Sequence, residues 1–197
     1  MAHLPELPIF RSQLQPELLG LLLLNPDRTW AARDLANRLD ATPVTIHREL
    51  HRVLEGGLIT REPVGRMHVY RAATDSPLYE PLRLLLERTV GVEPELTRAL
   101  GDIPGVEAAF IHGSYARKTA IRPTSDIDVL VLGDVDPHLL GQKLRRVEQR
   151  VGRDIDVLAY TPKEFSALVK SGNSLAGGIV RGPVTPLIGA IDALRAA

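Results

Sequence analysis

Apolar residues recur at helical spacing through the first part of the chain, with short polar turns between the stripes. A helix is predicted over residues 16–24 and a second one over 32–39. A third begins at Pro43, after the capping residue Thr42, and ends at Gly56. The stripe that defines the second helix, at i, i+3, i+4 and i+7, is Ala32, Leu35, Ala36 and Leu39.

After these helices the pattern changes to strands. Residues 58–62 and 67–72 predict a β-hairpin around the turn 63–66. Helix, turn, helix and hairpin is the order of a winged helix-turn-helix domain, which we expect over residues 1–75. The predicted DNA-contacting residues are Thr45, His47 and Arg48 on the third helix and Arg66 at the hairpin tip. The alternative is a solvated face on a packing or dimerisation module.

Residues 76–104 predict a helical linker. Leucines recur at helical spacing from Leu78, Gly91 and Pro94 interrupt the pattern, and a further helical stretch reaches Leu100. We expect the leucine stripe to pack between two domains, with a dimer interface as the alternative.

The remaining residues, 105–197, predict a second domain that mixes strands and helices. The predicted elements are strands at 106–112, 126–132 and 154–158, a short helix after the first strand, a helix over 161–170, a glycine-rich stretch, the segment 183–189 and a final short helix.

Two aspartates in this domain are spaced i, i+2 on an apolar strand. Asp126 and Asp128 would project from the same face of that strand. Two carboxylates so close repel each other unless a cation lies between them, and Mg²⁺ prefers such oxygen ligands. Asp156, in the next apolar strand, can complete a catalytic and metal-binding set, although Asp154 shares its parity. Alone, the Asp pair is equally compatible with a structural role, in which Asp126 caps a turn and Asp128 lies at a strand edge.

A Gly-Ser turn precedes the aspartates. Glycine lets the backbone approach a ligand closely, and a helix N-terminus offers free N–H groups to phosphate. The predicted nucleotide-binding residues are Gly113, Ser114, Arg117 and Lys118. His112, just before the turn, is placed to line the site, but we expect it to be a packed residue at the end of a strand.

Gly113-Ser114, eleven intervening residues, and then Asp126-Ile127-Asp128 resemble the motif of the polymerase-β-like nucleotidyltransferase superfamily. Tyr115-Ala116-Arg117 and the Ser before Asp126 are similar to its minimal nucleotidyltransferase branch. The resemblance implies that Asp156 is the third carboxylate. It also implies an α+β fold with a small mixed sheet flanked by helices, binding of Mg²⁺ and an NTP such as ATP, and transfer of a nucleoside monophosphate to a hydroxyl. With the winged helix in front, the chain resembles transcriptional regulators that carry a nucleotidyltransferase domain.

The resemblance has two departures. Lys118 stands where members of the family often have glycine, and the loop 119–124 is about one residue longer than usual. Only 41 residues follow Asp156, so we expect the acceptor to be another macromolecule. By analogy with the minimal branch, it would be a HEPN-type toxin protein or an RNA, and AMP the nucleotide.

Composition adds little. The formal net charge of the 197 residues is zero, but residues 28–71 hold eight arginines and five acidic residues, a balance of +3 that favours a phosphate-binding partner. The chain has no cysteine, which fits a reducing cytoplasm, and neither a signal peptide nor a membrane span is expected.

Three functions therefore remain open. The first is a DNA-binding regulator, by default a homodimer on an operator, with an active nucleotidyltransferase domain that can serve as an antitoxin. The second is a regulator whose nucleotidyltransferase fold only senses nucleotide. The third is a partner-binding module that acts by occlusion.

Overall fold

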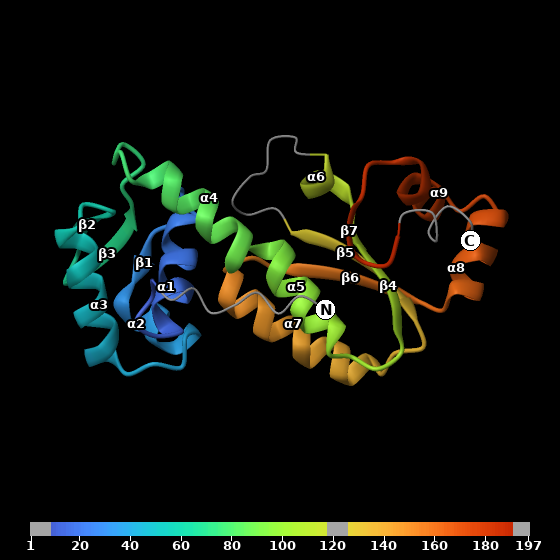
Figure 1. Ribbon diagram of the computed structural model, residues 1–197, viewed down its shortest axis with the longest axis horizontal. Helices are drawn as coiled ribbons and strands as arrows, with labels where there is room; N and C mark the ends of the chain where they lie inside the picture. Colours follow the sequence, from blue (N-terminus) through green and yellow to red (C-terminus); the bar gives the residue numbers. More distant parts are fainter. Residues whose placement is uncertain (1–8, 118–125, 191–197) are drawn as a thin grey trace. The chain divides into compact units, whose positions relative to one another are not determined.

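The computed structural model describes residues 9–117 and 126–190 (Figure 1). The chain divides into two compact units. Unit 1 comprises Met1–Glu95 together with Gln149–Gly152, and unit 2 comprises Leu96–Glu148 together with Arg153–Ala197. The segment expected as a linker, 76–104, is thus shared between the two units.

Unit 1 is built around one buried helix. Helix α1 (Leu14–Leu23) is apolar on all sides from Leu18 onward, and Leu21, Leu22 and Leu23 are fully buried, as expected for a helix that other elements surround. The elements that follow are β1 (Trp30–Ala31), α2 (Ala32–Arg38), α3 (Pro43–Glu55), β2 (Ile59–Val64) and β3 (Met67–Ala72). The predicted helices and hairpin strands of this region are confirmed to within two residues.

The strand β1 was not predicted. It pairs with β3, with Trp30 opposite Tyr70, in an antiparallel sheet of order β1-β3-β2. Its two residues are too few to show a period of two in the sequence. The pairing is instead a tertiary contact, which buries Trp30 in the core of unit 1.

The predicted cap of α3 is present. The Thr45 N–H donates a hydrogen bond to the Thr42 hydroxyl oxygen (3.3 Å), and Pro43 occupies the first turn. The capped helix buries one face against unit 1, formed by Ile46, Glu49, Leu50 and Val53.

Helix α4 (Tyr79–Thr89) also packs into unit 1. Leu86 lies fully buried in the same core as α1, and the Tyr79 hydroxyl donates to the Leu23 carbonyl oxygen (3.2 Å). Helix α5 (Val92–Gly101) contains Pro94, which was expected to interrupt the helical pattern. Pro94 falls in the first turn of the helix, where its missing N–H would have had no intrahelical partner.

Unit 2 contains a four-stranded mixed sheet of order β6-β5-β4-β7, as the resemblance implies. Strand β4 (Val106–Ile111) is antiparallel to β5 (Ile127–Gly133) and to β7 (Thr185–Ile188), whereas β5 and β6 (Ile155–Tyr160) are parallel. The parallel pair requires a crossover. Helix α7 (Pro137–Val151) is that crossover and was not predicted.

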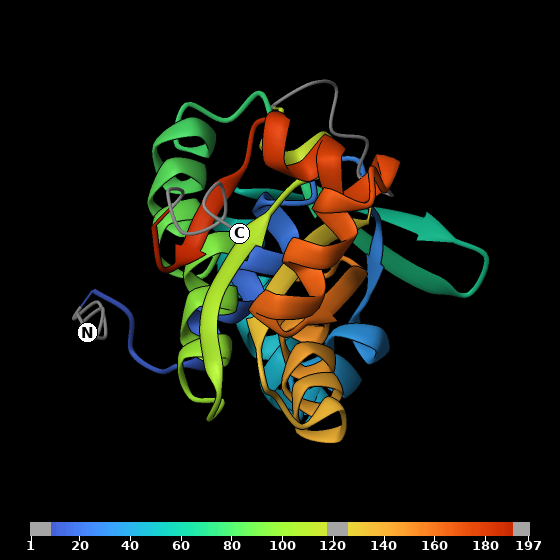
Figure 2. The same ribbon diagram turned by 90° about the vertical axis from the view of Figure 1, so that its right-hand side faces the viewer.

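Two helices cover the sheet through a shared apolar cluster (Figure 2). Helix α8 (Pro162–Lys170) contributes Phe165, and α9 (Ser174–Arg181) contributes Ala176 and Ile179. The sequence predicted only a glycine-rich stretch in place of α9. Asn173 starts this helix by accepting hydrogen bonds from two backbone N–H groups. The final helix expected after 189 lies outside the described residues.

In the part of the chain that the structure describes, no helix combines the length and apolar character that a membrane crossing requires.

Candidate active site

Asp128 and Asp156 are direct neighbours across two strands of unit 2. They occupy the same register position of the parallel strands β5 and β6, so their side chains project from the same face of the sheet. Adjacent strands lie about 4.8 Å apart. Asp128 is half-buried and Asp156 is exposed on the edge strand. The pair therefore forms an acidic site that is open to solvent on one side.

The two other aspartates lie just before these strands. Asp126 is exposed and lies just before β5, outside the strand in which the sequence placed it. Asp154 precedes β6, and its carbonyl oxygen accepts a hydrogen bond from the Ile127 N–H (2.9 Å). The register thus pairs Asp128 with Asp156 and not with Asp154.

Gly113 provides the surface on which the Asp128 carboxylate lies. Its φ of +69° is in the left-handed region, which favours glycine. A Cβ at this position would also collide with the Asp128 side chain. The turn is tied to β5, because the His112 N–H donates to the Asp128 carbonyl oxygen (2.9 Å). Glycine is therefore required here for two independent reasons.

The other predicted nucleotide-binding residues follow this turn on a short helix, α6 (Gly113–Ala116). Ser114 is half-buried and Arg117 is exposed at the end of α6. Lys118 lies outside the described residues. The structure therefore brings Gly113, Ser114 and the aspartates of β5 and β6 to one edge of the sheet, and Arg117 follows within one turn of helix.

His112 combines the two interpretations that the sequence allowed, because it is packed and also lies near the acidic site. It is buried, and burial lowers the pKa of its imidazole, while the charges of Asp128 and Asp156 act in the opposite direction. Its Nε2 has no hydrogen-bond partner within residues 9–117 and 126–190. The residue is packed at the end of a strand, as expected, and its imidazole also interacts electrostatically with the carboxylates of Asp128 and Asp156.

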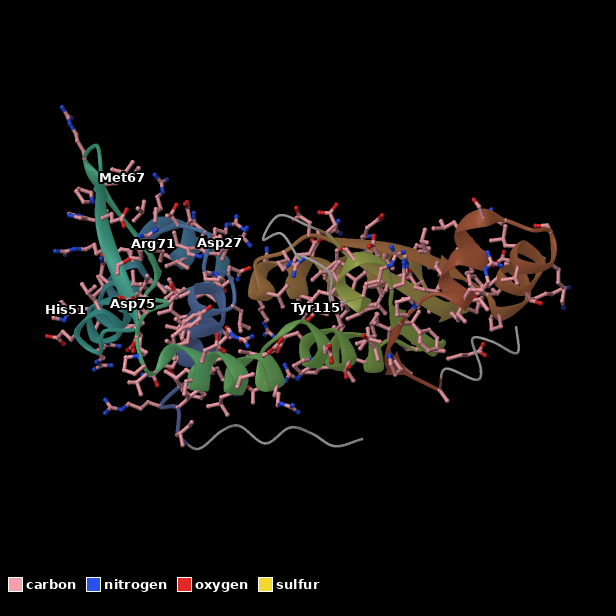
Figure 3. The ribbon with its side chains drawn as sticks, turned by 90° about the horizontal axis from the view of Figure 1, so that it is seen from above. Asp27, His51, Met67, Arg71, Asp75 and Tyr115 are labelled. Carbon is pink, nitrogen blue, oxygen red and sulfur yellow. The ribbon has the colours of Figure 1, made fainter. Side chains whose placement is uncertain are left out.

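Arg153 is the site residue that sequence reasoning missed. Its guanidinium carbon lies 5.6 Å from the ring centroid of Tyr115, which Figure 3 labels on α6. Burial lowers the pKa of Arg153, opposed by Tyr115 and Asp126. A cation here partly balances the acidic site. Its only signal in the sequence is its place next to Asp154, because no motif includes it.

The donor set fits a divalent cation that is shared with a substrate. Carboxylate oxygens are hard ligands, and Mg²⁺ is usually held by one or two carboxylates together with substrate phosphates. Among the described residues, no group of three or more His, Cys, Asp or Glu is arranged to hold a metal ion. Asp128 and Asp156 form a pair of carboxylates next to the Gly113 backbone. Such a pair suits a cation whose remaining ligands come from the substrate phosphates.

The predicted DNA-contacting residues lie in unit 1. His47 and Arg48 are exposed on α3, and the Arg48 Nε lies 3.7 Å from the Glu49 carboxylate. Thr45 is half-buried, and its hydroxyl oxygen lies 2.9 Å from that of Thr42. Arg66 is exposed in the turn between β2 and β3.

Comparison with known proteins identifies the second unit. Residues 94–180 match the family model of the nucleotidyltransferase domain. The comparison with curated proteins gave no match. Two solved structures show distant likeness, each covering 53% of this chain. A toxin–antitoxin complex with AMP-PNP is 20% identical, with 78% of that chain covered and a TM-score of 0.38. A mutant of the toxin–antitoxin MntA-HpeT is 16% identical, with 79% covered and a TM-score of 0.37.

Both likenesses are too distant to carry a property of either complex to this chain. The family model spans β4, β5 and β6 and the acidic site, from α5 to α9, whereas β7 lies beyond the matched residues. The match supports the enzyme class expected from the sequence, because residues 94–180 are similar to a nucleotidyltransferase domain.

Proposed function

We propose that unit 2 transfers a nucleoside monophosphate, AMP by preference, from an NTP to a hydroxyl of a protein or RNA acceptor. The observation that carries this proposal is the register of Asp128 and Asp156 on parallel strands beside the Gly113 turn. Carboxylates on one face, next to backbone that a ligand can approach closely, are what a phosphate-bound cation needs.

Asp126, Asp128 and Asp156 are the proposed ligands of Mg²⁺. When bound, the cation supplies charge neutralisation at the phosphates and lowers the pKa of a coordinated hydroxyl. Asp128 is held in place by the close packing of Gly113 and by the hydrogen bond from the His112 N–H to its carbonyl oxygen. Asp126 and Asp156 are exposed. The three aspartates are not grouped as a ligand set in this structure, so Asp126 would have to join the other two when the cation binds.

The turn residues would hold the triphosphate. The Ser114 hydroxyl donates to a phosphate oxygen, and Arg117, with Lys118, neutralises its charge. In the transfer, the acceptor oxygen bonds to the α-phosphorus, and the bond from the α-phosphorus to the α–β bridging oxygen breaks. Pyrophosphate leaves, and the acceptor proton passes to a carboxylate of the site and then to water.

For unit 1 we propose a winged helix-turn-helix that binds an operator DNA as a homodimer. In support, α2 and α3 are joined by a short turn, and the antiparallel hairpin β2–β3 follows. His47 and Arg48 on α3, with Arg66 on the hairpin, are exposed cations or polar donors suited to DNA. A cytoplasmic antitoxin that modifies a HEPN-type toxin would combine both units.

The proposal is tested by incubating the protein with each α-³²P-labelled NTP and Mg²⁺, alone and with the product of the adjacent gene. We expect a labelled protein or RNA band that is absent with Asp128→Ala. The same preparation should shift an operator duplex whether or not Asp128 is present.

A second candidate is nucleotide sensing without transfer. It is favoured by Lys118, which stands where the family often has glycine. In that case no label would be transferred, and the affinity for DNA would change with ATP and Mg²⁺, because coupling requires a nucleotide that binds two states differently.

A further inference from the structure

One stripe of α3 faces solvent in unit 1. Its members recur at i, i+3, i+4 and i+7, so they lie on one helix face. This outward stripe consists of Val44, His47, Arg48 and His51, all of them exposed. Two of its members already have acidic neighbours on the same helix: Arg48 with Glu49 and His51 with Glu55, the latter at 3.2 Å.

Val44 is the apolar member of the outward stripe. It is 77% exposed, although Ile46, Leu50 and Val53 of the same helix are buried. Val64 and Met67, which flank the hairpin tip, are also exposed apolar residues. Met67 and the α3 residue His51 are both labelled in Figure 3.

The first turn of α3 exposes two apolar side chains, Pro43 and Val44, and Val44 is the one on the outward stripe. The Thr42 hydroxyl oxygen accepts from the Thr45 N–H (3.3 Å) and lies 2.9 Å from the Thr45 hydroxyl oxygen. The two threonines are therefore engaged in the cap, and Pro43 has no N–H to offer. A recognition helix contacts bases chiefly with its N-terminal residues, so Val44 is better placed for a base than the engaged Thr45.

Unit 1 also carries exposed arginines on its hairpin, and cations of this kind suit a polyanion. Arg61, Arg66 and Arg71 are exposed on the hairpin, and of these Arg71 pairs with Glu62 (3.1 Å). The exposed apolar side chain of Val44 matches one feature of DNA, the thymine C5-methyl group, which is the apolar group that a base edge presents in the major groove. The arginines would bind backbone phosphates of the DNA on either side of that base.

We propose that Val44 is a specificity-determining residue that contacts the C5-methyl group of a thymine in the major groove. This inference rests on the proposed DNA binding of unit 1. The inference means that α3 recognises a particular thymine. It predicts that the protein's preference for thymine at that position depends on the methyl group of the base and not on a hydrogen bond.

The test begins with duplexes selected by the full chain from a random library. Each thymine of the selected site is then replaced in turn by deoxyuridine, which removes only the methyl group, and binding is measured by fluorescence anisotropy. At one thymine per half-site, deoxyuridine should weaken wild-type binding about fourfold, the factor that corresponds to burial of one methyl group. Val44→Ala should lose this discrimination, and Val44→Thr, which keeps a γ-methyl, should retain it.

The inference is overturned if the protein binds a selected site but no thymine replacement weakens binding, or if Val44→Ala still discriminates at the same thymine. A change from dimer to monomer in Val44→Ala, measured by sedimentation, would also overturn the inference. Val44 would then lie in an interface between two copies of the chain. Failure of DNA binding itself is recognised separately, since no duplex would then be enriched in the selection. That outcome would remove the proposed function and this inference together.

Discussion

Asp128 on β5 and Asp156 on β6 occupy the same register position of two parallel strands, and Asp154 does not. If Asp128 and Asp156 hold the cation, Asp128→Asn and Asp156→Asn should each lower nucleotide transfer by about 100-fold or more, the scale of losing one electrostatic group at a transition state. The measurement is the initial rate of transfer from α-³²P-labelled ATP.

Asp154→Asn is the matched control for that prediction. Asp154 precedes β6, and what it contributes to the sheet is its carbonyl oxygen, which the substitution keeps. We expect transfer to stay within about threefold of wild type. A loss in Asp154→Asn as large as that in Asp156→Asn would mean that the third ligand is misassigned.

Gly113→Ala should abolish transfer, because the added Cβ meets the Asp128 carboxylate and moves it. Gly172→Ala controls for backbone strain. Gly172 also has a positive φ, of +78°, but no atom lies within 4 Å of its added Cβ. Both variants carry a left-handed penalty of about 1–2 kcal/mol, measured by urea unfolding. Equal losses of transfer in the two variants would show that strain, and not the contact with Asp128, is responsible.

The start of α8 predicts a pH dependence of stability. The Thr161 N–H and hydroxyl donate to the Glu164 carboxylate at 2.9 and 2.8 Å, and these hydrogen bonds lower the pKa of Glu164. A carboxyl with a lower pKa in the folded state stabilises above its ordinary pKa, and the stabilisation disappears as the pH falls through the folded value.

The free energy of unfolding of wild type should therefore exceed that of Glu164→Gln at neutral pH. The difference should narrow once the pH falls below the ordinary glutamate pKa of about 4.3. Chemical unfolding of both proteins, from neutral pH to pH values below that pKa, measures this difference in the free energy of unfolding. A difference that is independent of pH would contradict the account of the cap.

Arg66 tests the DNA-binding proposal for unit 1. It is exposed at the hairpin tip, where we expect it to contact a phosphate. Arg66→Ala should weaken binding to all duplexes about equally and reduce the slope of log K against log salt by about one. A loss confined to one sequence would indicate a base contact, and an unchanged slope would remove Arg66 from the interface.

The sequence predicted best what local patterns encode. The cap at Thr42, the hairpin strands and the strands that carry Asp128 and Asp156 all depend on residues close in the chain, and these elements are where the pattern placed them. Asp126 was expected at the start of a strand but lies just before β5. The site residues themselves remain predictions, since their roles depend on a substrate and a cation.

Features that depend on distant contacts could not be predicted. Strand β1 exists because Trp30 pairs with Tyr70, and the place of α4 in unit 1 depends on Leu86 entering the core of α1. Arg153 reaches Tyr115 only through the fold. Helix α9 was missed because its glycines have low helix propensity, which its cap at Asn173 and its packing against the sheet overcome.

The central claim is that the acidic site of unit 2 transfers a nucleotide. The most direct measurement is a denaturing gel after incubation with each α-³²P-labelled NTP and Mg²⁺, with and without the product of the adjacent gene, beside Asp126→Ala and Asp128→Ala. We predict a labelled protein or RNA band, strongest with ATP, that both variants lack. A band that persists in the two variants, or no label with any NTP despite measurable ATP binding, would contradict the claim.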